Sequence, residues 1–103
     1  MGKLIHSHVD KFPGDVTLFD PVPYPAYIAW KKAWESVDIK QPANLDMQLV
    51  LWGGIRAMVE KWEIPNYDIN NPSAVPHRAA VLRLMSWLVI EVGKVIAGES
   101  DPN

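Results

Sequence analysis

Two histidines near the start of the chain are the residues whose types and spacing come closest to a metal site. His6 and His8 stand two positions apart, and side chains at that spacing point to the same side of an extended strand. Both imidazoles could therefore bind one metal ion, with Asp10 or His77 as a further ligand. Two or three candidate ligands near a chain terminus are weak evidence for a metal site. The favoured interpretation is that the two histidines are half-exposed residues of a hairpin. We therefore predict no metal and no other cofactor.

No arrangement of residues in the sequence predicts an enzyme. There is no cysteine, which excludes disulfides, thiolate catalysis and cysteine-ligated zinc or iron–sulfur clusters. The nucleophile-elbow motif of serine hydrolases is also missing. The adjacent glycines Gly53 and Gly54 are not followed by the lysine and the serine or threonine of a phosphate-binding loop. We therefore expect a protein without catalytic residues.

Glu91 is a carboxylate within a strongly apolar segment. The helical period places it at the border of the apolar face, where a cation on the same or a neighbouring helix is within reach. We expect Glu91 to form a salt bridge with Arg83, Lys94 or Arg56 rather than to act as a general acid.

The charge and hydropathy of the chain narrow the classes of partner. Lysine and arginine number 10 and aspartate and glutamate 12, which gives a formal net charge of −2 without any run of like charge. Nucleic-acid binding needs concentrated basic residues, so nucleic acid is not an expected partner. The N-terminus lacks the basic start and apolar run of a signal peptide, and no stretch of about 18 residues is apolar throughout. A membrane is therefore not an expected partner either.

Helical periodicity organises most of the chain and is strongest near the C-terminus. We predict helices over residues 25–37, 45–62 and 76–98. Pro76 suits a first helical turn and Gly98 suits a C-terminal cap. The expected core face of the third helix consists of apolar residues at helical spacing, namely Val81, Leu82, Met85, Leu88, Val89, Val92 and Ile96.

The N-terminal residues alternate in a way that is typical of short strands. Pro13 and Gly14 suit the two central positions of a type II turn, so this segment predicts a β-hairpin or two extended arms. Prolines at positions 21, 23 and 25 then predict an extended connector. A stiff linker is the favoured interpretation of this connector, and a proline-rich recognition segment is the alternative.

The fold class that follows is mainly α, with a three-helix core. A chain of 103 residues with 49% hydrophobic residues forms one domain with a modest core. We place the short hairpin or extended arm in residues 1–20, the helical core in 21–98 and a flexible tail in 99–103.

Two helix faces that lie opposite the expected core are candidate partner-binding surfaces, because exposed apolar residues mark interaction sites. On the third helix the candidate residues are Trp87, Ile90, Arg83 and Lys94. On the second helix they are Val50, Gly53 and Ala57. A second core layer, covered by the hairpin or the first helix, is the alternative interpretation. The Gly53–Gly54 pair indicates either close packing of another helix or a local kink.

Several short motifs follow one another along the chain. Phe12-Pro13-Gly14-x-Val16-x-Leu18 precedes a proline-bounded helix with Tyr27-x-x-Trp30. Trp62 ends the second helix, and Ser86-Trp87-Leu88-x-x-Glu91 lies in the third. This combination resembles a pattern in small proteins encoded in bacteriophage tail modules. The sequence is thus similar to the tail assembly chaperones of long-tailed phages.

The resemblance implies a small, mostly helical, non-enzymatic protein that coats the long helical tape measure protein until tail-tube subunits replace it. It further implies a homo-oligomer that acts in the host cytoplasm and is absent from the finished virion. The strand-like N-terminus departs from an all-helical chaperone. A structural tail or connector component that remains in the viral particle is therefore the alternative.

Overall fold

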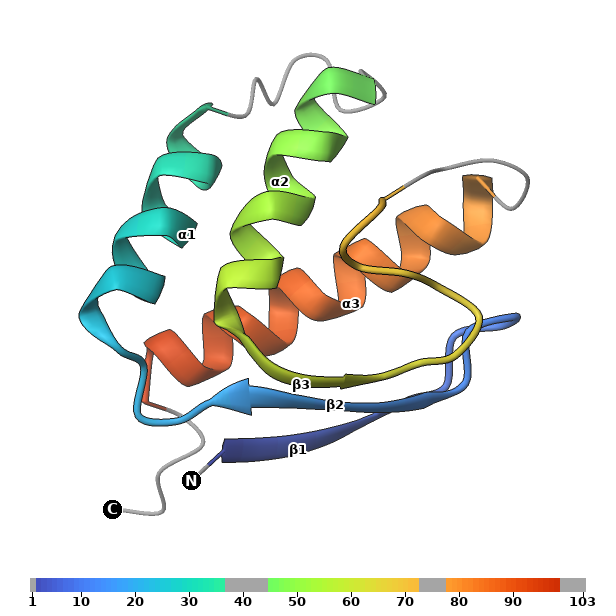
Figure 1. The fold of residues 1–103 in the computed structure, drawn as a ribbon, viewed down its shortest axis with the longest axis horizontal. Coiled ribbons are helices and arrows are strands. Elements are labelled where there is room, and N and C mark those ends of the chain that lie inside the picture. The colour runs from blue at the N-terminus through green and yellow to red at the C-terminus, as the bar shows by residue number, and fades with distance from the viewer. Residues whose placement is uncertain (1, 37–44, 73–77, 99–103) are drawn as a thin grey trace.

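The computed structural model describes residues 2–36, 45–72 and 78–98, which form three antiparallel strands and three helices (Figure 1). In chain order the elements are β1 (Gly2–Ser7), β2 (Gly14–Phe19), α1 (Tyr24–Ser36), α2 (Leu45–Met58), β3 (Val59–Glu63) and α3 (Arg78–Ile96). The predicted helix start at Pro76 and the predicted tail in 99–103 lie outside the described residues.

β2 is the central strand of the sheet, with β1 on one side and β3 on the other. The register aligns Ile5 with Val16 and Val16 with Trp62. Side chains alternate between the two faces of the sheet, so Ile5, Val16 and Leu18 are buried in the core, whereas Leu4 is exposed on the outer face. The predicted alternation and the predicted hairpin are both confirmed.

The prediction of a mainly α fold is wrong, because residues 59–63 form a strand rather than the end of the second helix. α2 ends at Met58, and the chain continues directly into β3. The charged residues of β3 are good helix formers, and Trp62 lies at helical spacing from Met58, so the local signal favours a helix. β3 instead pairs with β2, where Thr17 lies opposite Lys61. Strand pairing therefore overrides local propensity, and the fold is an α+β fold.

The turn of the hairpin also differs from the prediction. The backbone reverses near Lys11, which has a φ of 75°, rather than at Pro13 and Gly14. Gly14 begins β2 with a φ of 147°, and a Cβ atom there would lie 2.4 Å from the carbonyl oxygen of Glu63. A glycine at this position therefore allows the end of β3 to approach β2.

α1 and α2 pack side by side and run in opposite directions (Figure 1). At their contact a Cβ atom on Gly54 would lie 2.6 Å from the Cβ of Ala33 and 3.4 Å from Cε3 of Trp30. Of the two interpretations of the glycine pair, close packing of another helix thus applies to Gly54. At Gly53, no heavy atom of residues 2–36, 45–72 and 78–98 lies within 4 Å of the position that a Cβ atom would take.

α3 contributes one face to the hydrophobic core, through the buried residues Ala80, Val81, Leu84, Met85, Leu88, Val92 and Val95. This face is rotated about the helix axis relative to the predicted one. Leu84 and Val95 were not expected in the core but are buried, whereas Ile96 was expected there and is 36% exposed. Apolar residues cover so much of α3 that their spacing alone does not fix its inward face.

Candidate partner-binding surface

The outer side of α3 carries a stripe of residues in which apolar side chains lie between basic ones. We call Arg83, Trp87, Ile90 and Lys94 the α3 stripe. Their spacing of four, three and four positions places them along one side of the helix. Ile90 is 59% exposed, and Arg83 and Lys94 are exposed at the two ends. Trp87 is half-buried and packs against the hydrophobic core, so only part of its ring is available to a partner.

Glu91 fixes the charge pattern at one end of this stripe. Its Oε1 lies 3.6 Å from Nζ of Lys94, and its Oε2 lies 3.7 Å from Nζ of Lys3. The predicted salt bridge with Lys94 is confirmed, and the one with Lys3 was not predicted because it depends on the position of β1. With 15% side-chain exposure, Glu91 links α3 to the sheet and pairs with Lys94 at the end of the stripe.

The second predicted surface lies on α2. We call Val50, Gly53 and Ala57 the α2 stripe. Val50 is 40% exposed, Gly53 is exposed and Ala57 is half-buried. None of the described residues approaches the position of a Gly53 side chain, so the middle of the stripe is open toward this part of the chain.

The structure does not join the two stripes into one surface. On α2 the buried residues Leu51, Ile55 and Met58 lie on the side of the helix opposite the α2 stripe. On α3 the buried residues Leu84 and Leu88 lie opposite Ile90 in the same way. Both helices direct their buried sides into one core. The two stripes therefore lie on separate outer surfaces of the molecule.

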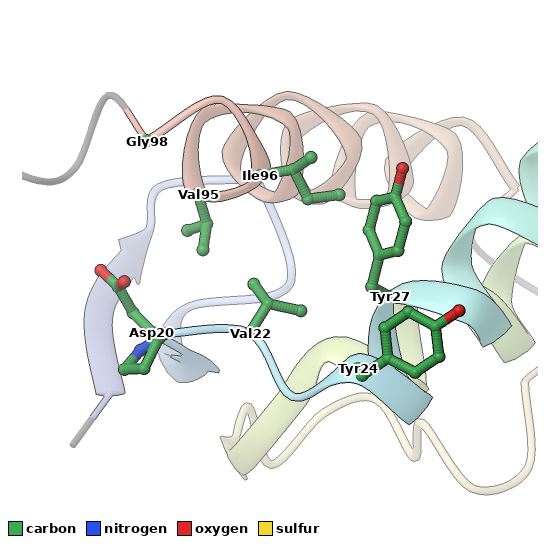
Figure 2. Close-up of a pocket in the computed structure, with 8 residues that line it drawn as sticks. Asp20, Val22, Tyr24, Tyr27, Val95, Ile96 and Gly98 are labelled. Carbon is green, nitrogen blue, oxygen red and sulfur yellow. The ribbon is translucent and has the colours of Figure 1, made fainter.

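A pocket that was not predicted lies where the connector between β2 and α1 meets the end of α3 (Figure 2). It has a volume of about 370 Å³. We call it the tyrosine pocket, and its lining residues are Asp20, Pro21, Val22, Tyr24, Tyr27, Val95, Ile96 and Gly98. Tyr24 is 74% exposed and Tyr27 is 36% exposed.

One sequence signal could have indicated this pocket. The alternating prolines keep the connector extended up to the start of α1, and they place Tyr24 in the short segment where the connector meets this helix. An exposed aromatic residue in such a segment is a candidate contact residue. The contribution of α3 could not be foreseen, because Val95 and Ile96 reach the pocket only through the packing of the C-terminal helix beside the start of α1.

The histidines do not form a metal site in the described part of the chain. Nδ1 of His6 lies 2.6 Å from Oδ1 of Asp15, its neighbour on β2, and His8 is exposed beyond the end of β1. Residues 2–36, 45–72 and 78–98 contain no group of three side chains suited to holding a metal ion. The further candidate ligand His77 lies outside these residues. Over the same ranges, no helix has the length and hydropathy needed to cross a membrane.

The chain was compared with protein families, curated protein sequences and solved structures. No protein-family model, no curated protein sequence and no solved structure matches the chain.

Proposed function

We propose that the chain is a non-enzymatic protein-binding protein of the tail assembly chaperone type, which holds a helical segment of a tape measure-like partner along the α3 stripe. The proposal places its action in the host cytoplasm and includes self-association into a homo-oligomer. The observation that carries it is the 59% exposure of Ile90. Ile90 lies next to half-buried Trp87, and exposed Arg83 and Lys94 flank the two apolar residues.

The composition of the α3 stripe suits a protein partner. Single exposed apolar side chains are common on protein surfaces. Here, however, Ile90 and the partly exposed Trp87 lie on the same side of the helix and form one apolar surface. Tryptophan and arginine are enriched in the residues that dominate interface energies. An amphipathic helix with an apolar centre and acidic ends would match the stripe, because its apolar residues would cover Ile90 and its acids would meet Arg83 and Lys94.

A structural subunit of a viral particle is the second candidate. The sheet order leaves an outer edge on β1 and another on β3 without a strand partner in the described part of the chain. Exposed strand edges can pair with strands of neighbouring subunits, and such pairing suits a permanent assembly.

Capture of partners by the tagged protein, from cells that express the complete gene set of its source, tests these functions. A long, helix-rich protein bound by many copies of the chain is the result expected for a chaperone. Retention in finished particles, together with tube or capsid subunits, would support the structural function. A monomer that retains neither would overturn the protein-binding proposal.

Ile90→Glu is the variant that tests the α3 stripe. We expect it to release the captured partner, because it places a charge within the apolar part of the stripe while leaving the core unchanged. Leu4→Glu is the matched control: Leu4 is 53% exposed, but on the outer face of the sheet. If both variants capture the partner equally well, the α3 stripe is not its binding site. Trp87→Ala is less suitable, because Trp87 packs against the core and its loss also lowers stability.

A further inference from the structure

We infer that the tyrosine pocket is a second binding site, which accepts a basic side chain, arginine or lysine, from a partner protein. The pocket is formed by different residues from the α3 stripe, so this inference does not depend on the proposed function.

The two tyrosines offer the aromatic surface that a cation prefers. Tyr24 and Tyr27 are three positions apart at the start of α1, and Figure 2 shows their rings next to each other on one side of the pocket. Both rings are accessible, with exposures of 74% and 36%. A guanidinium or ammonium group above an aromatic ring is attracted by the negative ring face.

The charges around the pocket also favour a cation. Asp20 is the only charged residue among the eight described residues that line it. It already interacts within the chain, and Figure 2 shows its carboxylate on the side of the pocket away from the tyrosine rings, so it disfavours an anion rather than binding the cation itself. The C-terminal end of α3, which carries partial negative charge from its last carbonyl groups, lies at the same place through Val95, Ile96 and Gly98. Lys94 does not line the pocket, and its ammonium group is paired with Glu91. An anion would therefore meet no compensating positive side chain here.

The remaining lining residues suit the stem of a long basic side chain. Val22, Val95 and Ile96 form an apolar wall, and Figure 2 shows Ile96 directed toward the ring of Tyr27. Arginine and lysine bury their methylene groups along such apolar surface while the charged end stays at its rim. A small inorganic cation would make no use of this wall, which is why we assign the pocket to a side chain of a protein.

Titration of the full-length, isotope-labelled protein with short peptides, followed by NMR, tests the inference. The probe is acetyl-Ala-Leu-Arg-Leu-Ala-amide, and the control peptide carries neutral citrulline in place of arginine. We expect the arginine peptide to shift the signals of Tyr24, Tyr27 and Ile96 and to bind about two- to fivefold more tightly than the citrulline peptide. Equal binding of the two peptides, or no shift of these signals at saturating peptide, would overturn the inference.

Two variants of Tyr24 separate the ring from the apolar contact. Tyr24→Leu should abolish the preference for arginine over citrulline, and Tyr24→Phe should keep it because the ring face remains. The high exposure of Tyr24 makes both changes compatible with folding, which circular dichroism would verify. An arginine preference that persists in Tyr24→Leu would contradict the role of the ring. If the same signals shift when the protein is concentrated in the absence of peptide, the pocket binds a second copy of the chain instead.

Discussion

Gly53 and Gly54 are adjacent in sequence but have different roles in the fold. A side chain on Gly54 would collide with Ala33 and approach Trp30, whereas a side chain on Gly53 would meet open space. The sequence left two interpretations of the pair open, close packing of another helix or a local kink, because two glycines in a helix need compensation. It could not indicate which glycine is packed, since that depends on the direction from which α1 approaches α2.

Alanine substitutions at the two glycines should change stability in opposite directions. We expect Gly53→Ala to stabilise the protein by about 0.5–1 kcal/mol, through the helix propensity of alanine and a less flexible unfolded chain. We expect Gly54→Ala to destabilise it by about 1–3 kcal/mol, because α1 must move away from the added methyl group. Urea unfolding followed by circular dichroism gives both values. A stabilising Gly54→Ala would mean that α1 and α2 are farther apart than described.

At the scale of elements, the sequence predicts most of the helical structure and misses the third strand. The positions of α1, the first part of α2 and α3 follow from apolar periodicity and from prolines near the helix starts. β3 could not be predicted, since Met58, Val59 and Trp62 fit a helical stripe as well as a strand. The deciding factor is the free edge of β2, which is distant in sequence. The inward face of α3 was predicted only in part for a related reason, because apolar residues cover so much of this helix that their spacing alone does not fix the buried side.

Engineered disulfides can distinguish the strand from the predicted helix in residues 59–63. Thr17 and Lys61 lie directly opposite each other on β2 and β3, so Thr17→Cys combined with Lys61→Cys should form a disulfide on mild oxidation. The native chain has no cysteine, so any disulfide formed is the engineered one. Thiol titration and mass spectrometry measure its yield.

The control pair for this experiment is Leu4→Cys with Lys61→Cys. β2 separates these two positions, because Leu4 pairs with Thr17 on its other side. Two strand spacings amount to about 9.5 Å, which exceeds the reach of a disulfide. If the control pair forms a disulfide within the monomer as readily as the first pair, the strand order is not β1-β2-β3.

At the scale of the whole molecule, the fold separates surfaces that the sequence presents as equivalent. The α2 and α3 stripes were both identified as faces opposite the core, and the structure places them on separate outer surfaces. Contact between the α3 stripe of one copy and the α2 stripe of another would therefore be head-to-tail. An interface of this kind leaves one stripe free at each end, so it permits chains of subunits longer than a dimer.

Mixing two variants tests whether the proposed self-association uses both stripes. Ile90→Glu disables the α3 stripe, and Val50→Glu, at a position that is 40% exposed, disables the α2 stripe. We expect each variant alone to be monomeric in sedimentation velocity, measured without the helical partner because that partner would compete with a second copy for the α3 stripe. An equimolar mixture should form a dimer and nothing larger, because one intact stripe remains on each variant and the two are complementary. If one variant alone still forms a dimer, the contact pairs the intact stripe of that variant in both copies, and the head-to-tail arrangement is excluded. The α2 and α3 stripes would then serve different partners.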